Sequence, residues 1–197
     1  MQPLVFQLTI YALLFWIVYL FWFIIEIVGS IRQKAGEHAQ KQDRGSVVFL
    51  VAALYVETFF NFVSPWWFPQ ANITWNRPLL FWISLALMLF GIILRQHAIF
   101  TLGRSFTREV AIRPDQQVIQ SGPYRLIRHP AYSGTMLTTL GFSLIMTNWA
   151  SLILTMLGFF ISHLYRIAVE ERALRTSLGQ TYVEYMQHTK RLIPLIF

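Results

Sequence analysis

Long apolar runs separated by short polar segments dominate the amino-acid sequence. A bilayer core requires about 20 predominantly apolar residues in each helix that crosses it. Three runs meet this requirement readily: residues 4–28, 47–63 and 79–100. Two further runs are separated only by Thr147 and Asn148, which predicts a tight helical hairpin over residues 131–146 and 149–167. We therefore predict an all-α integral membrane protein with about five transmembrane helices.

The run over residues 131–146 is short for a full span and is rich in small and hydroxyl-bearing side chains. These are Ser133, Gly134, Thr135, Thr138, Thr139 and Gly141. Such residues allow helices to approach each other closely inside a membrane. We expect this face to contact protein rather than lipid, and a partial span is an alternative to a full one.

Composition agrees with a membrane protein of one domain. Hydrophobic residues make up 55% of the 197 residues and charged residues 13%, compared with roughly 25% charged in soluble domains. We find no repeat or linker, so we treat residues 1–197 as one membrane domain, with three helices in 1–100 and the remaining ones in 101–197. The net charge of +7 accompanies no nucleic-acid-binding motif. The absence of cysteine excludes disulfides and every cysteine metal site.

The basic residues predict the orientation in the membrane, because cytoplasmic loops accumulate lysine and arginine. Only Arg77 lies in the loop after the second helix, where Trp66, Trp67 and Trp75 suit an interfacial aromatic belt. The other fifteen of the sixteen basic residues fall on the opposite side: Arg32, Lys34, Lys41, Arg44, Arg95, Arg104, Arg108, Arg113, Arg125, Arg128, Arg166, Arg172, Arg175, Lys190 and Arg191. We predict an outside N-terminus and a cytoplasmic C-terminus. We also expect a retained first helix, because its apolar run is too long for a signal-peptide core.

Two cytoplasmic segments are long and polar enough to hold a site: residues 101–130 and the tail after Arg166. Within the tail, Gly179 predicts the end of one short helix. Thr181, followed three residues later by Glu184, predicts a capping box that opens another.

The densest polar stretch leads into the fourth predicted helix. Gly122 and Pro123 indicate a turn, and Pro130 suits the first turn of a helix. Arg128 and His129 would then lie at a helix start, whose free backbone N–H groups favour an anion. The alternative is that both side chains only anchor the helix at lipid headgroups. No glycine motif for a Rossmann or Walker nucleotide site is present.

A second candidate is the pair Arg166 and Glu170, which lie four residues apart and share a helix face. The order basic before acidic is the less favourable one for helix stability, so local stabilisation explains the pair poorly. A headgroup-facing ion pair is the alternative. The neighbouring Glu171, Arg172 and Arg175 are assigned mainly to a solvated face.

Isolated polar residues inside the spans carry less weight. Glu57 lies near the middle of the second helix, where a carboxyl group is costly and is a functional candidate by default. A hydrogen-bonded structural role is the alternative for Glu57. His97 and His163 lie on largely apolar helices, and we interpret them as packing or interfacial residues.

Taken in order, several short motifs resemble the isoprenylcysteine carboxyl methyltransferase family, with its relatives among the phospholipid N-methyltransferases. The resemblance spans about residues 103–194. One departure is Gln116, where the eukaryotic members lead us to expect histidine. The motifs are Gly122-Pro123-Tyr124, Arg128-His129-Pro130 with Tyr132 and Gly134, Arg166 before Glu170-Glu171, Gly179 with Tyr182 and Tyr185, and Arg191-Leu192-Ile193-Pro194.

The resemblance implies a binding site for S-adenosylmethionine in the half 101–197. Arg166 would face the methyl acceptor, and Glu170 would complete the cofactor site, which makes these two the implied catalytic residues. No metal is implied. The other implied cofactor-binding residues are Gln116, Gln117, Val118, Ile119, Tyr124, His129, Pro130, Ala131 and Tyr132.

The expected function is therefore methylation of a lipophilic acceptor, such as a prenylcysteine-like carboxylate, which enters from the bilayer while the cofactor enters from the cytoplasm. A phospholipid amine or a small thiol is an alternative acceptor. Two other classes stay open: a sterol reductase-like protein that uses NADPH, and a non-enzymatic membrane scaffold. The expected partners are membrane lipids and a lipophilic substrate, with no nucleic acid, and the expected location is a prokaryotic inner membrane.

Overall fold

The computed structural model describes residues 2–7, 9–32, 40–41, 45–107, 111–112 and 116–194. Five long helices form its body, and short helical turns and two very short strands lie between them. In chain order the elements are η1 (Leu4–Phe6), α1 (Thr9–Arg32), β1 (Gln40–Lys41), α2 (Ser46–Trp67), η2 (Pro69–Ala71), α3 (Arg77–Leu102), η3 (Gly103–Ser105), β2 (Ala111–Ile112), η4 (Gly122–Arg125), α4 (Pro130–Ile145), α5 (Trp149–Leu178) and α6 (Gln180–His188).

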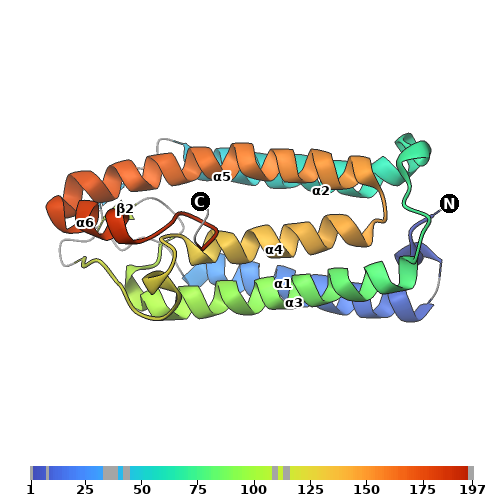
Figure 1. Ribbon diagram of the computed structural model, residues 1–197, viewed down its shortest axis with the longest axis horizontal. Coiled ribbons are helices and arrows are strands. Elements are labelled where there is room, and N and C mark those ends of the chain that lie inside the picture. The colour runs from blue at the N-terminus through green and yellow to red at the C-terminus, as the bar shows by residue number, and fades with distance from the viewer. Residues whose placement is uncertain are drawn as a thin grey trace.

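The long helices run roughly parallel to one axis and form an elongated bundle (Figure 1). The most extensive helix contacts are those of α3 with α4 and of α2 with α5, and α4 also packs against α5. As Figure 1 shows, α2 and α5 lie along one side of the bundle, α1 and α3 along the other, and α4 between them. The predicted helical hairpin, formed by α4 and α5, therefore joins the two sides.

Four of these helices, α1, α2, α3 and α5, are long and apolar enough to cross a membrane. The helix α4 has 16 residues, which corresponds to a length of about 24 Å and falls short of a bilayer core of about 30 Å. Large apolar side chains such as Ile93 and Ile153 are exposed along the outer faces of the spans. The prediction of an all-helical integral membrane protein is confirmed, with α4 as its short member.

Glycines allow the close contact between α3 and α4. A Cβ atom added at Gly134 would lie 2.6 Å from the backbone nitrogen of Arg95, and one at Gly141 would lie 2.5 Å from the carbonyl oxygen of Ser84. On the same helix, Ser133 and Thr138 are buried. The prediction that the small, polar face of α4 contacts protein is thus confirmed.

The helix α5 is longer than the sequence suggested. It continues past residue 167 to Leu178 and ends where Gly179 adopts a positive φ of 56°. Good helix formers in residues 168–178 extend it beyond the apolar run. The predicted capping box is wrong, since Gly179 is the N-cap of α6 and the Glu184 carboxylate accepts a hydrogen bond from the Gln180 side chain at 3.3 Å.

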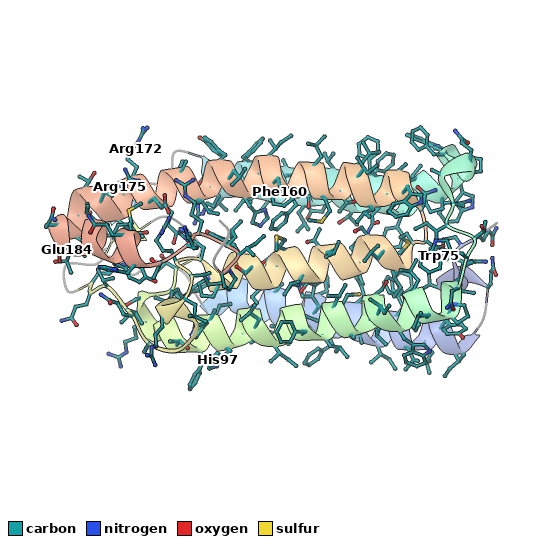
Figure 2. All side chains as sticks on the ribbon, viewed as in Figure 1. Trp75, His97, Phe160, Arg172, Arg175 and Glu184 are labelled. Carbon is teal, nitrogen blue, oxygen red and sulfur yellow. The ribbon has the colours of Figure 1, made fainter. Side chains whose placement is uncertain are left out.

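Two-residue strands that the sequence analysis did not predict connect the segments after α1 and α3. Strand β1 pairs with β2 in antiparallel fashion. Exposed charged side chains such as Arg172, Arg175 and Glu184 gather at one end of the bundle, whereas Trp75 lies at the other (Figure 2). Four basic residues used for the predicted orientation lie outside the described residues: Lys34, Arg44, Arg108 and Arg113.

Candidate functional site

A cavity opens at the end of the bundle where α5 and α6 meet the segment before α4. The space between its lining atoms, with the open mouth included, is about 830 Å³. Pro130 does not line it but is buried as the first residue of α4. The other ten predicted site residues all do: Gln116, Gln117, Val118, Ile119, Tyr124, His129, Ala131, Tyr132, Arg166 and Glu170.

The turn before α4 sets the position of the first group of these side chains. Gly122 adopts a positive φ of 55° and opens η4, in which Tyr124 is buried. Pro130 occupies the first turn of α4 and His129 is its N-cap residue, as the sequence predicted. Proline favours this position because its fixed φ is helical and its missing N–H would be unpaired there.

The segment that follows α6 holds this turn in place by hydrogen bonds, and we call this set of contacts the brace. The backbone N–H of Arg128 donates to the Lys190 carbonyl at 2.7 Å, and that of His129 donates to the Arg191 carbonyl at 3.0 Å. The hydroxyl of Ser133 donates to the carbonyl of Leu192 at 2.5 Å. The Arg191-Leu192-Ile193-Pro194 motif therefore includes two residues that hold the start of α4 in place.

Glu171 is the charged centre of this brace, and its assignment to a solvated face is wrong. Its side chain is 3% exposed, and its Oε1 atom lies 3.0 Å from Nε of Arg128. Nε2 of His129 lies 3.4 Å from the same oxygen, and Nη2 of Arg191 lies 3.1 Å from Oε2. The neighbouring Arg172 and Arg175 are exposed, as predicted. The carboxylate thus joins α5, the turn before α4 and the C-terminal segment.

Tyr132 connects Arg166 with Glu170. Its hydroxyl donates to Oε2 of Glu170 at 2.9 Å and accepts a hydrogen bond from Nε of Arg166 at 3.2 Å. The Nη1 atom of Arg166 also donates to the hydroxyl of Ser46, at the start of α2, at 2.6 Å. Two donors of the guanidinium are thus fixed by side chains from α4 and α2, which orients its plane.

The burial of Arg166 and His129 argues against the alternative in which these side chains only contact lipid headgroups. Arg166 is 2% exposed and His129 is 5% exposed, so neither side chain projects to the bilayer surface. The His129 ring stacks on that of Tyr132 at a centroid distance of 5.6 Å. His163 packs against Phe159, as expected of a packing residue. Both candidate groups therefore face the protein interior.

Tyrosines form much of the remaining wall. Tyr182 and Tyr185 come from α6, and the hydroxyl of Tyr185 donates to the carbonyl of Tyr124 at 2.7 Å. Burial raises the pKa of all three phenols, that of Tyr185 to about 12. Their hydroxyls stay neutral near pH 7 and act as hydrogen-bond donors.

Sequence reasoning missed other parts of this wall. Tyr182, Tyr185 and Leu174 were expected only as apolar positions of the tail that lie against the membrane or the core. Leu102 and Phe106 had no signal because they are ordinary apolar residues. Only a fold that brings α3, α5 and α6 together makes them neighbours.

Comparison with known proteins assigns the chain to a family. The family model for the isoprenylcysteine carboxyl methyltransferase family matches residues 83–176, a range that includes every predicted site residue. The probable protein-S-isoprenylcysteine O-methyltransferase of Oryza sativa subsp. indica is 33% identical over 131 residues, which are 66% of this chain and 67% of that protein. The chain belongs to the isoprenylcysteine carboxyl methyltransferase family.

Other members of the isoprenylcysteine carboxyl methyltransferase family agree. Protein-S-isoprenylcysteine O-methyltransferase B of Arabidopsis thaliana is 35% identical over 120 residues, 58% of this chain and 61% of that protein. The solved structure of the eukaryotic intramembrane Ras methyltransferase of this family matches with a TM-score of 0.59 and 27% identity, over 75% of this chain and 52% of that chain. The chain therefore spans about half to two thirds of the length of these family members.

Proposed function

We propose that this protein is a membrane-embedded methyltransferase that uses S-adenosylmethionine to methylate the carboxylate of a prenylcysteine-like lipophilic acceptor. The observation that carries the proposal is that ten of the eleven implied site residues line one and the same cavity. The names of the rice and Arabidopsis relatives, O-methyltransferases for S-isoprenylcysteine, support the class of reaction.

The lining of the cavity suits this cofactor chemically. S-adenosylmethionine carries positive charge on its sulfur and its amino group, together with a flat adenine ring. The Glu170 side chain is 30% exposed and offers a carboxylate to a cation. Tyrosine faces attract cations as well, and Val118 and Ile119 supply apolar contact for a ring. We assign Gln116 and Gln117 to the polar groups of the cofactor.

Methyl transfer requires the acceptor oxygen, the methyl carbon and the sulfur to lie in line. The acceptor oxygen forms a bond to the methyl carbon while the carbon–sulfur bond breaks, and the electron pair stays on sulfur. A carboxylate is already ionised at neutral pH, so this step needs no base. Arg166 would orient the carboxylate by hydrogen bonds from its planar guanidinium, and positioning of this kind supplies much of the rate acceleration.

The contacts of Glu170 favour a carboxylate over an amine acceptor. An amine would require a base to remove a proton, and a thiol would require a stabilised thiolate. Oε2 of Glu170 already accepts the phenolic proton of Tyr132 at 2.9 Å. Arg166, which faces the same cavity, attracts an anionic acceptor and repels a cationic one.

We also propose that the cavity faces the cytoplasm and that the acceptor enters sideways from the bilayer. The exposed Arg172 and Arg175 lie at the cavity end of the bundle and Trp75 at the opposite end (Figure 2), which supports the predicted orientation. The cavity lining among the described residues begins at Leu102, which supports the assignment of the cofactor side to residues 101–197. A prokaryotic inner membrane stays a prediction.

The test compares Arg166→Ala with Glu170→Ala. Arg166→Ala should leave the affinity for S-adenosylhomocysteine nearly unchanged and lower single-turnover transfer about 100-fold or more, because the acceptor is misplaced. Glu170→Ala should weaken binding about 10- to 100-fold through loss of a charged contact. Arg166→Lys should restore little, because an ammonium lacks the planar fork. Arg172→Ala, an exposed change on the same helix, is the control.

Binding isotherms and a transfer assay with a prenylated cysteine analogue provide the measurements. Near-normal transfer by folded Arg166→Ala would contradict the assigned role of the arginine. Stabilisation by NADPH rather than S-adenosylhomocysteine would favour the sterol reductase-like alternative, and binding of neither would favour a scaffold.

A further inference from the structure

A second cavity lies between all five long helices, and its wall shares no residue with the site described above. Each helix contributes at least one side chain to its wall: Trp22 from α1, Glu57 from α2, Met88 from α3, Thr138 from α4 and Thr155 from α5. Four of these helices, α1, α2, α3 and α5, are long and apolar enough to cross a membrane. Polar groups at this depth need protein or water partners, because lipid chains offer none.

Three polar groups on this wall have unused hydrogen-bonding capacity. Thr155 is 1% exposed, and within the part of the chain that the structure describes, no partner reaches its hydroxyl or the buried indole nitrogen of Trp22. Glu57 is 6% exposed, and its Oε1 atom lies 3.5 Å from the hydroxyl of Ser162, at the outer limit of a hydrogen bond. Thr138 differs, since its hydroxyl donates to the Gly134 carbonyl.

The cavity has the size of a water site. The volume open to the centre of a water molecule is about 20 Å³, and one bound water requires roughly 10–15 Å³ by this measure, together with 2–4 polar partners. We propose that one ordered water molecule binds here. It accepts a hydrogen bond from the indole of Trp22 and bonds to the Thr155 hydroxyl and the Glu57 carboxyl group.

This water links α1 to the pair α2 and α5 at the middle of the bundle. Only 6% of the α1 span is buried, and apolar contact alone gives little drive for association between helices in lipid. Glu26 of α1 pairs with Arg95 of α3 at 2.5 Å, and Arg95 also donates to the hydroxyl of Thr135 in α4 at 3.2 Å. The rings of Trp16 and Tyr19 already contact Phe62 of α2, and the water adds a polar link between α1 and that side of the bundle.

Gly158 is the residue that gives Glu57 its place in this site. A Cβ atom at Gly158 would lie 2.8 Å from Cγ of Glu57. A larger residue there would push the carboxyl group away from its present position. The missing side chain of Gly158 therefore leaves room for the Glu57 carboxyl group at the cavity wall.

The sign of one stability change tests the proposal. If water bridges the three groups, Thr155→Val removes a hydrogen bond and should lower the midpoint of thermal unfolding by about 2–4 °C. If the cavity is dry, the same change removes an unpaired hydroxyl, and the midpoint should stay or rise. The control is Ser84→Ala, whose buried hydroxyl donates within its own helix to the Leu80 carbonyl and lies outside the cavity wall.

A measurement on the unaltered protein decides the matter even if Thr155→Val does not fold. In deuterated detergent, nuclear magnetic resonance should detect a nuclear Overhauser effect between water and the indole proton of Trp22, whose signal is assigned with Trp22→Phe. A nuclear Overhauser effect with added protonated lipid instead of water, or with neither, would overturn the proposal.

Discussion

Glu171→Gln removes one negative charge from the brace at the start of α4 while it keeps the shape of the side chain. The carboxylate is 3% exposed, and its partner Arg128 is 8% exposed at a distance of 3.0 Å. The buried ring of His129 lies 3.4 Å from the same carboxylate. The substitution therefore leaves a buried guanidinium without its counter-charge, whereas a solvated glutamate would tolerate the change.

The size of the effect follows from the burial of each partner. Removing one partner of a buried ion pair costs about 3–5 kcal/mol. Arg191 is 38% exposed, so its share is that of a surface pair, about 0–1 kcal/mol. Arg128 keeps the carbonyl acceptors of Met186 and Thr189, which argues for the lower end, about 3 kcal/mol. For a chain of this length that corresponds to a fall of about 6–12 °C in the unfolding midpoint.

Thermal unfolding in detergent at one fixed scan rate measures the shift, because the unfolding of membrane proteins is often irreversible. The matched control is Glu184→Gln, an exposed glutamate on α6 whose carboxylate contacts Gln180. Its midpoint should stay within about 2 °C, in keeping with a surface change of about 0.5 kcal/mol. Equal midpoints for Glu171→Gln and Glu184→Gln would refute the argument that Glu171 holds the brace together.

Three further predictions concern other parts of the molecule. Tyr185→Phe leaves the Tyr124 carbonyl without its donor and should cost about 1 kcal/mol in unfolding experiments. Because burial raises the pKa of Tyr185 to about 12, its proton-linked contribution to stability is complete below about pH 10 and is lost as the pH rises towards 12; this alkaline loss should be smaller in Tyr185→Phe. Gly134→Ala should lower the unfolding midpoint strongly, since the added methyl group meets the backbone of α3 at 2.6 Å. A cysteine at Gln117 should be labelled by a thiol reagent only from the cytoplasmic side; labelling from outside intact cells would reverse the predicted orientation.

The sequence alone determined the elements whose cause is local. Apolar run length predicted the spans, and the glycine, serine and threonine content of residues 131–146 predicted a face that contacts protein. The turn at Gly122 and the helix start at Pro130 followed from the backbone limits of those two residue types. The resemblance in short motifs named the residues that line the cavity, because family motifs retain residue identity even where spacing alone carries little information.

Only the tertiary structure decided which charged residues act together. Glu171 and Arg172 are neighbours in α5, yet one is buried and the other exposed, because consecutive residues of a helix point about 100° apart and distant segments determine which side is covered. Arg128 lies 43 positions away in the chain from Glu171, and Tyr132 lies 34 and 38 positions from Arg166 and Glu170. Contacts over such separations depend on how the helices pack, which no local pattern specifies.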